Sequence, residues 1–529
     1  MSSPTGGADQ PPKNPLQEIV QPFIDLVHAP RALWGINLAY VIEGMVYFGM
    51  LGYLAIHFSS YIFQGVEHAD EWSHNMVMVL TSGITLAMFL LGFVADKWGV
   101  RFALIAAFVL LLLGRVLISA APTIFGLTPH GVGSPLHWVT MAGILLVIIG
   151  YGMYQPAAYA GVRQFTTPKT AAMGFAMLYA LMNLGGWLPS FAFLLRDDNW
   201  AGMGITGVYW VYTAFTLVAL LCTVLILTRS TVADAVATAK RETAAIKAAE
   251  QAALASTAEA KPTAPPETLP GGGLPPLHLW VFVALIVAAA CWRLPDKYRW
   301  PGAGLIAAVW LLLVIIPDTR RYIARHPLTN AKFFFFIFAL IPVQTLFTYN
   351  WLVLPQYISR AFAGGWIGEY FEIASNANPI LIFILVPIIT AVTQKAKVYN
   401  MMILGTCVMA APAFLLALGP HWWTLFPYIL IMTIGEAMWQ PRFLQYAAEI
   451  APEGRTGAYM GVAQLPWFLT KMLVPLLYSG WMMNRYCPEI GEKKTEFMWL
   501  IFGCIAITST ILLILAKGWI GKDFKTKAD

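Results

Sequence analysis

Four charged residues lie inside long apolar runs, where a charge has large consequences. Glu43 and Glu436 each place a carboxylate in such a run, and Lys471 and Arg115 each place a cation there. A charge surrounded by lipid is costly unless it faces water, a partner charge or a cavity. The two carboxylates are therefore candidate proton carriers, and we expect Lys471 to pair with Glu436 or Glu43. A structural carboxylate bonded to a neighbouring helix is the alternative for Glu43. For both cations the alternative is a snorkelling or interhelical structural contact, and for Arg115 this is the favoured interpretation.

A polar turn separates two of the apolar runs and carries charges at a defined spacing. It extends from Gly92 to Arg101 and holds four notable residues, Asp96, Lys97, Gly99 and Arg101. A glycine permits a tight turn, and the charges can pair with the ends of neighbouring helices. Such pairs can bias a bundle that has two states. We predict that these four residues gate a conformational change, with an ordinary polar loop as the alternative.

Neutral polar side chains occur in other apolar runs and are candidate contacts for a bound solute. Asn350 and Gln356 lie in one run, and Trp439 and Gln440 lie three and four residues after Glu436. Amide groups can hydrogen-bond a solute, and an indole can do so as a donor. Ordinary packing is the alternative for each of them, because aromatic residues are abundant in this chain.

The composition places most of the chain in a membrane. Of 529 residues, 58% are hydrophobic and 11% are charged, and the mean hydropathy is +0.66. A soluble chain carries roughly 25% charged residues. The net charge of +6 is spread over short loops, which argues against nucleic-acid binding. The five cysteines lack metal-ligand spacing. We find no Walker A loop, no H-E-x-x-H and no nucleophile elbow, so we expect no enzyme, no cofactor and no metal site.

Apolar runs predict fourteen membrane spans. A spanning helix needs about 20 apolar residues. Candidate spans lie near 32–57, 76–96, 101–120, 138–162, 170–195, 205–228, 278–293, 301–317, 332–354, 378–394, 400–418, 423–442, 456–480 and 496–516. Lys and Arg are concentrated in the loops of one side, which predicts that both termini are cytoplasmic. The turn from Arg293 to Arg299 is an exception, so the pair at 278–317 either is an insertion or does not fully cross.

The spans divide into two sets of six around a long linker. The linker is Ala-rich up to Ala260 and then rich in Pro and Gly, which predicts a partly helical and then a flexible segment. Leu16 to Val27 have the apolar spacing of an interfacial helix. The predicted parts are an N-terminal cytoplasmic segment 1–31, a six-helix bundle 32–228, a cytoplasmic linker 229–277, an inserted helix pair 278–317, a second six-helix bundle 332–516 and a cytoplasmic tail 517–529.

This layout, together with the turn at Asp96 to Arg101, resembles the major facilitator superfamily. The turn has the form G-x-x-x-D-K-x-G-x-R and follows the second span, as the loop between the second and third helices does in that superfamily. The resemblance implies an all-α membrane carrier with two six-helix bundles, a solute cavity near the bilayer midplane and alternating access by rocking of the bundles.

A narrower resemblance is to the proton-coupled oligopeptide transporter family. Val41 to Met50 resembles the first-helix signature E-x-x-E-R-F-x-Y-Y-G, with Glu43 on the second Glu. Gly150 to Pro156 is similar to the fourth-helix G-x-G-x-x-K-P, with Gln155 in place of Lys. Tyr179 to Gly185 is similar to the fifth-helix Y-x-x-x-N-x-G, and Gly435 to Pro441 to the tenth-helix G-E-x-x-x-S-P. An inserted helix pair is another feature that bacterial members of that family share.

The resemblance implies roles for individual residues. Glu436 inherits the contact with a peptide amino terminus, Asn183 a contact with the peptide backbone, and Tyr47 a place on the cavity wall. Two family charges are absent, because Gly44 stands where the family has Arg and Gln155 where it has Lys. Tyr40 also replaces the first Glu. These departures put the usual proton route and the recognition of a peptide carboxylate in doubt.

We therefore expect a secondary transporter of a small polar solute, such as a di- or tripeptide or a related amide, coupled to protons. Its expected site residues are Glu43 and Glu436 for protons and Tyr47, Gln155, Asn183, Asn350, Trp439, Gln440 and Lys471 for the solute. The expected location is a cell membrane, namely the bacterial inner membrane, and the expected form is a monomer. One alternative is a carrier of a nucleoside, sugar derivative or drug with rerouted or absent coupling. Another is a membrane receptor that does not transport.

Overall fold

The computed structural model describes residues 30–166, 171–256, 274–293, 296–393, 396–449, 459 and 462–520. Every regular element in this part of the chain is a helix, and each of the fourteen predicted spans contains helix. The predicted interfacial helix at residues 16–27 and the Pro- and Gly-rich linker segment up to residue 273 lie outside the described residues. The prediction of an all-α membrane fold is confirmed.

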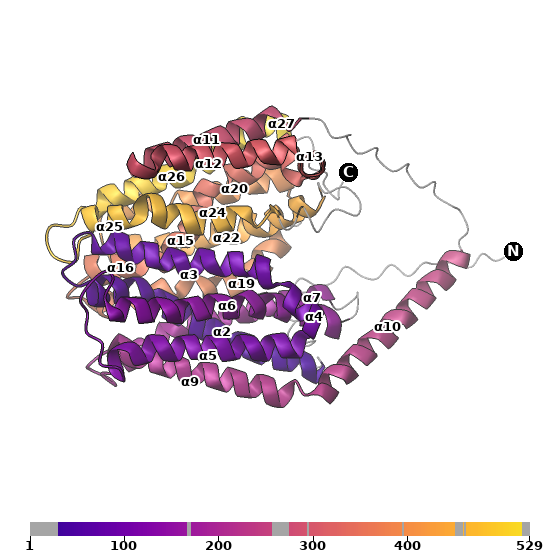
Figure 1. Cartoon of the computed structure of the whole chain (residues 1–529), viewed down its shortest axis with the longest axis horizontal. Helices are drawn as coiled ribbons and strands as arrows, with labels where there is room; N and C mark the ends of the chain where they lie inside the picture. Colours follow the sequence, from indigo (N-terminus) through magenta and orange to yellow (C-terminus); the bar gives the residue numbers. More distant parts are fainter. Residues whose placement is uncertain are drawn as a thin grey trace.

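The N-terminal half is built from long helices that run side by side in the lower part of Figure 1. They are α2 (Arg31–Ile56), α3 (Ala69–Leu91), α5 (Val100–Thr123), α6 (Pro135–Phe165), α7 (Ala171–Trp187) and α9 (Gly204–Ile226), with α4 (Phe93–Trp98), the π-helical η1 (His57–Ile62), the 3-10 turn η2 (Leu188–Phe191) and α8 (Phe193–Arg196) between them. Local sequence sets their ends. Ser134 caps α6 by accepting from the His137 amide, and Pro135 follows at the first helical position.

The C-terminal half forms the upper group of helices in Figure 1. Its helices are α14 (Ala331–Ala339), α15 (Ile341–Leu352), α16 (Leu354–Ala361), α17 (Trp366–Glu369), α18 (Phe371–Ser375), α19 (Ala377–Val392), α20 (Val398–Ala410), α21 (Ala413–Leu416), α22 (Trp422–Glu449), α24 (Leu465–Val474), the π-helical η4 (Pro475–Ser479), α25 (Gly480–Tyr486), α26 (Thr495–Leu515) and α27 (Lys517–Ile520). α15 packs against α24 and α26, and α22 packs against α19 and α20.

The predicted span at 332–354 is broken into α14 and α15, and α16 begins at its last residue. Pro342 and Pro355 stand near the starts of α15 and α16, where a proline lacks the N–H that would continue the preceding helix. The Val343 amide donates instead to Ser509 Oγ on α26 at 2.8 Å. The break is therefore satisfied by a neighbouring helix, which is how membrane helices tolerate proline.

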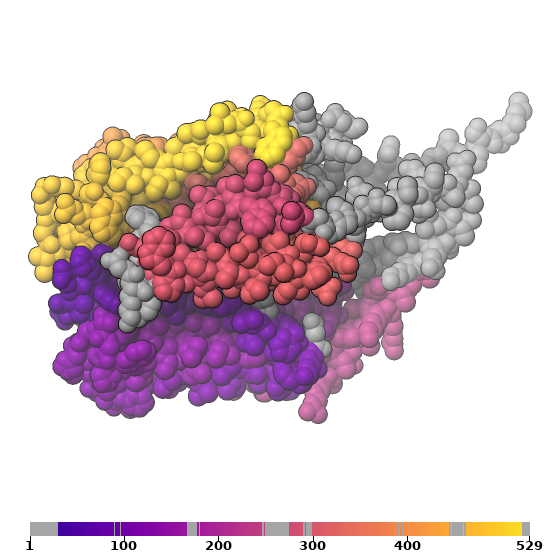
Figure 2. All heavy atoms as spheres, turned by 45° about the horizontal axis from the view of Figure 1, so that its top comes forward, coloured from indigo at the N-terminus to yellow at the C-terminus, as the bar shows by residue number. Residues whose placement is uncertain are grey.

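Two segments lie outside the two bundles. The linker helix α10 (Arg229–Ser256) leaves the N-terminal half at an angle to the other helices (Figure 1). The inserted pair, α11 (Leu277–Arg293) and α12 (Asp296–Ile315), packs against α14 through Phe282. Figure 2 shows the pair on the surface beside the seam between the halves. The chain then bends by 91° into α13 (Pro317–Ala324).

The outer surface of the bundle is apolar. Among the described residues, seven helices are long and apolar enough to cross a membrane, or eight if the bent α12–α13 pair is one span. Large apolar side chains are exposed along them, including Leu221, Leu225, Leu305 and Leu312. An exposed apolar surface of this extent is unsuited to water and suited to lipid. The molecule is a multi-pass membrane protein.

Candidate functional site

Glu43 lies in a buried ion pair at the centre of the N-terminal half. Arg115 on α5 donates to both of its carboxylate oxygens, from Nη1 to Oε2 at 2.7 Å and from Nη2 to Oε1. Tyr151 on α6 donates its hydroxyl to Oε1, and Thr216 on α9 accepts from Arg115 Nη1 at 2.7 Å. Glu43 is 0% and Arg115 1% exposed. The predicted pairing of Glu43 with Lys471 is therefore wrong, and Arg115 is the partner.

A close crossing of α2 and α7 explains why position 44 is a glycine and not a charged residue. A Cβ added at Gly44 would lie 3.2 Å from the carbonyl oxygen of Met182 on α7. A Cβ at Gly185 would lie 2.5 Å from the carbonyl oxygen of Val41, and 3.1 Å from the Gly44 Cα. The two glycines thus let the backbones of α2 and α7 touch, and there is no room for an arginine. The N-terminal half takes its buried cation from α5 instead.

Aromatic and amide groups form the rest of the predicted N-terminal site. The Tyr40 ring stacks on Tyr154 with centroids 5.5 Å apart, and Gln155 Nε2 lies 3.5 Å from the Tyr40 hydroxyl oxygen. Tyr47 is half-buried, and its ring meets the Tyr151 ring edge to face at 5.0 Å. Asn183 is half-buried in α7. This group contributes hydroxyls and amides but no available charge.

Glu436 occupies a different environment in the C-terminal half. It is 4% exposed, and Asn378 on α19 donates to its Oε2 at 2.8 Å. Asn378 also donates to Thr433 at 3.0 Å. In the described part of the chain, no cation lies within 4.0 Å of this carboxylate, so its predicted ion pair with Lys471 is absent here. Lys471 itself is half-buried in α24.

Two predicted solute contacts have other roles in this structure. Trp439 is wholly buried, donates from Nε1 to Met409 Sδ at 3.1 Å and backs onto Gly405 of α20. In this structure it packs α22 against α20. Gln356 is wholly buried in a polar network between the halves. Gln440 and Asn350 are both half-buried, and Asn350 lies on α15.

Ion pairs join the two halves at one end of the molecule, which we call the far end because it is opposite the start of linker helix α10. Arg360 on α16 donates to both oxygens of Asp70 on α3, at 2.7 and 2.8 Å. Arg196 Nε donates to Glu372 Oε1 at 2.6 Å, and Tyr53 donates to the same oxygen at 2.6 Å. Sequence reasoning missed this network, since its members stand near helix ends where charged residues are common.

A buried histidine extends the far-end network toward the middle of the molecule. His74 Nδ1 lies 2.7 Å from Ser479 Oγ, and His74 Nε2 lies 2.8 Å from Gln356 Oε1. Gln356 donates onward to Ser59 at 3.1 Å. Because His74 and Ser59 belong to the N-terminal half and the other two to the C-terminal half, separation of the halves at this end must break all three contacts.

The predicted gating turn lies at the opposite end, which we call the linker end. Gly99 has a φ of +86°, a conformation that glycine adopts without strain, and it separates α4 from α5. Arg101 Nε donates at 2.6 Å to the carbonyl of Leu227, the residue that follows α9. The Lys97 ammonium lies 5.0 Å from the centre of the Trp98 ring. The side chain of Asp96 lies outside the described residues.

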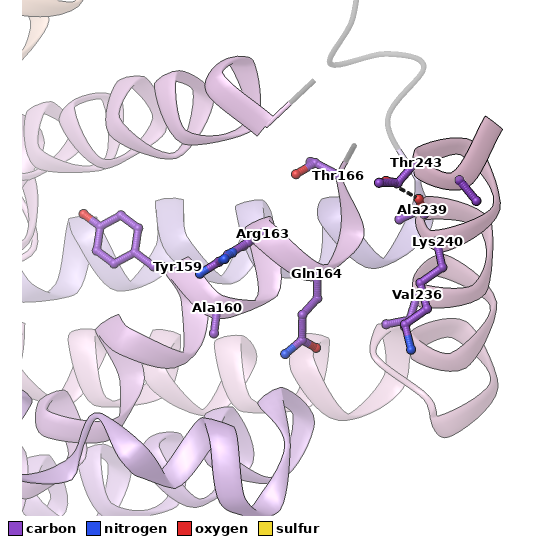
Figure 3. A pocket seen from close by; sticks show the side chains of 10 residues that line it. Tyr159, Ala160, Arg163, Gln164, Thr166, Val236, Ala239, Lys240 and Thr243 are labelled. Carbon is purple, nitrogen blue, oxygen red and sulfur yellow. Dashed lines mark hydrogen bonds between the residues drawn. The ribbon is translucent and has the colours of Figure 1, made fainter. Parts of the chain in front are cut away.

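A cavity of about 790 Å³ lies at the linker end, between α6 and α10 (Figure 3). Its wall includes Tyr159, Arg163 and Gln164 from α6 and Lys240 and Thr243 from α10. Both basic side chains are exposed, and the cavity is open to the surface. Neither Glu43 nor Glu436 lines this cavity, so it is separate from the charged groups at the centre of the bundles.

Comparisons with known proteins support this architecture. The family model described as Major Facilitator Superfamily matches residues 32–475. A peptide transporter POT crystallised with sulfate has a TM-score of 0.61 at 18% identity, covering 94% of this chain and 96% of that chain. The POT family transporter PepTSo has a TM-score of 0.62 at 16% identity, covering 93% and 99%.

A POT family transporter crystallised with 5-aminolevulinic acid has a TM-score of 0.57 at 16% identity, covering 93% of this chain and 97% of that chain. Identities this low establish a shared fold and leave the cargo open. A search of curated protein sequences finds no match. The match to the family model extends over most of the chain, from the first helix into the predicted span at 456–480. The chain is a transporter that belongs to the Major Facilitator Superfamily.

Proposed function

We propose that this protein moves a small polar solute, such as a di- or tripeptide or a related amide, by alternating access coupled to protons. The observation that carries the proposal is the polar closure of the far end. The Asp70–Arg360 and Arg196–Glu372 pairs hold the halves together there. Rocking of the two bundles about a central cavity would break these pairs and open that end.

The predicted orientation assigns a direction to this closure. If both termini are cytoplasmic, the linker end faces the cytoplasm and the far end faces outward. The present conformation is then closed to the outside. The turn at Gly99 and the bond from Arg101 to Leu227 would lie at the cytoplasmic end, where they are placed to change when that end closes.

We assign proton binding to Glu436 rather than to Glu43. The Glu43 carboxylate accepts from Arg115 and Tyr151, so protonation would leave a buried guanidinium without its counter-charge. Glu436 has an amide donor from Asn378 and no neighbouring cation among the described residues, so protonation removes a buried charge instead of exposing one. A carboxylate in that setting can exist in both states during a transport cycle.

Purified protein in liposomes tests this assignment. We expect Glu436→Gln to retain solute counterflow, which needs no proton movement, and to lose accumulation driven by an imposed pH gradient. Glu496→Gln, which alters an exposed carboxylate at the start of α26, is the matched control and keeps both activities. Full gradient-driven accumulation by Glu436→Gln would contradict the assignment.

A carrier of another solute, such as a nucleoside, sugar derivative or drug, is the second candidate. It is favoured by the commitment of Arg115 to Glu43 and by the hydroxyl and amide character of Tyr40, Tyr47 and Gln155. Competition for counterflow between dipeptides and such solutes separates the two candidates. Absence of counterflow for every solute would favour a receptor that does not transport.

A further inference from the structure

Lys471 lies in the last turn of α24 and has no counter-charge among the described residues. In the described residues, no carboxylate oxygen lies within 4.0 Å of its ammonium nitrogen, and no hydrogen bond reaches it. Thr470 and Val474 on the same helix are buried, and after α24 the chain continues directly as η4 and α25. A lone ammonium at this depth is costly unless a ligand or water compensates for it. The position therefore calls for a negatively charged or strongly polar partner.

The packing of α24 on α15 places an amide at the same level. Trp467 on α24 stacks on Phe347 of α15, with ring centroids 4.7 Å apart and planes 27° apart. Lys471 follows Trp467 by four residues and Asn350 follows Phe347 by three, which is about one turn, or roughly 5 Å, along each helix. α15 leads into α16 and α24 leads into α25 at the far end (Figure 1), so one turn beyond the stacked rings we infer that Lys471 and Asn350 come to about the same level. Asn350 Oδ1 is buried and has no hydrogen-bond partner.

A contact with the N-terminal half identifies a third group at this level. His74 on α3 contacts Ser479, the last residue of η4, at 2.7 Å. The two chains are antiparallel at this contact, and α3 packs against both η4 and α24. Ser82 follows His74 by eight residues on α3, and Lys471 precedes Ser479 by eight residues on the facing chain. Both steps run toward the linker end and cover roughly 12 Å, so Ser82 and Lys471 come to about the same level. Ser82 Oγ is buried and has no hydrogen-bond partner.

We propose that Lys471, Asn350 and Ser82 form the subsite that binds a carboxylate group of the transported solute. The Lys471 ammonium, the Asn350 amide nitrogen and the Ser82 hydroxyl can each donate to a carboxylate, and the ammonium supplies the charge-assisted bond; the Asn350 Oδ1 oxygen can itself accept from the ammonium. Arg115 in the N-terminal half is committed to Glu43 and is 1% exposed, so it cannot serve a ligand in this way. A ligand here would touch α3 of one half and α15 and α24 of the other. This inference rests on the proposed transport of a small polar solute and names its chemical class.

Matched acid and amide solutes test the subsite. The probes are alanyl-alanine and its C-terminal carboxamide, measured by counterflow in liposomes containing the full chain. We expect wild type to prefer the free acid, and Lys471→Met to raise the KM for the acid by roughly tenfold or more while leaving that for the amide unchanged. Lys471→Arg keeps most of the preference. Asn350→Ala and Ser82→Ala reduce it several-fold, since each removes a neutral donor.

Controls separate a recognition role from a structural one. Lys517→Met removes an exposed lysine of α27 and should leave the preference intact. Because Lys471 has no ion-pair or hydrogen-bond partner within the part of the chain that the structure describes, Lys471→Met should unfold at the same temperature as wild type or higher. A marked loss of stability, or an acid preference that survives Lys471→Met, overturns the subsite. Two other results overturn the subsite and leave the proposed transport function intact. One is equal transport of acid and amide by wild type, and the other is counterflow of a neutral solute alone. Failure of every solute to counterflow overturns the proposed function as well.

Discussion

The Glu43–Arg115 pair allows a quantitative test of how the N-terminal half is held together. The pair joins α2 to α5, and Tyr151 and Thr216 add bonds from α6 and α9. Because both charges are almost fully buried, removing either partner leaves the other uncompensated. Breaking a buried pair in this way costs about 3–5 kcal/mol. We expect Glu43→Gln and Arg115→Met each to lower the free energy of unfolding by that amount.

The double variant decides the interpretation. Glu43→Gln combined with Arg115→Met removes both charges, so it should recover most of the loss and stay within about 1–2 kcal/mol of wild type. The assay is denaturant titration in mixed micelles, with size exclusion to confirm a homogeneous protein. If the two losses add in the double variant, the pair does not act as a unit. Loss of proton-driven uptake in Glu43→Gln at unchanged stability would assign proton carriage to Glu43 and refute our reasoning.

Two further predictions concern helix contact and gating. Gly185→Ala places a Cβ 2.5 Å from the Val41 carbonyl oxygen, so we expect α2 and α7 to separate at a cost of roughly 1–3 kcal/mol, measured by the same titration; unchanged stability would contradict this close contact. Asp70→Asn removes the counter-charge of Arg360 and should favour the form that is open at the far end. The cysteine of Ser60→Cys should then react faster with a membrane-impermeant maleimide, whereas that of Ser230→Cys, at the linker end, should not. Equal labelling rates for Ser60→Cys with and without Asp70→Asn would argue against a gating role.

Periodic apolar runs and turn residues were sufficient to predict the class of fold. Gly99 has the left-handed backbone that its place in a tight turn requires, and Arg101 bonds to a helix end as its spacing suggests. Helix continuity was harder to predict. Pro342 and Pro355 interrupt the helix of the predicted span at 332–354 because a proline has no N–H to continue it, and Ser509 on another helix accepts from the Val343 amide beside the first break.

Charge pairing could not be predicted in the same way. Glu43 and Arg115 are 72 positions apart, and their contact depends on which faces of α2 and α5 meet. The sequence suggested Lys471 as a partner because it is also a cation in a span, yet no carboxylate of the described residues reaches it. The rotation of α22, which turns Trp439 toward Gly405, could not be predicted either.

The sequence by itself determined that this chain lies in a membrane, that its spans form two sets, and which residues carry unusual charges. These properties follow from composition and local spacing, which act within one helix. Only the tertiary structure decided which charges neutralise each other, which glycines serve as contact points and which polar groups remain without partners. Those outcomes depend on the relative rotation and depth of packed helices, and a shift of one residue changes the facing side by about 100°.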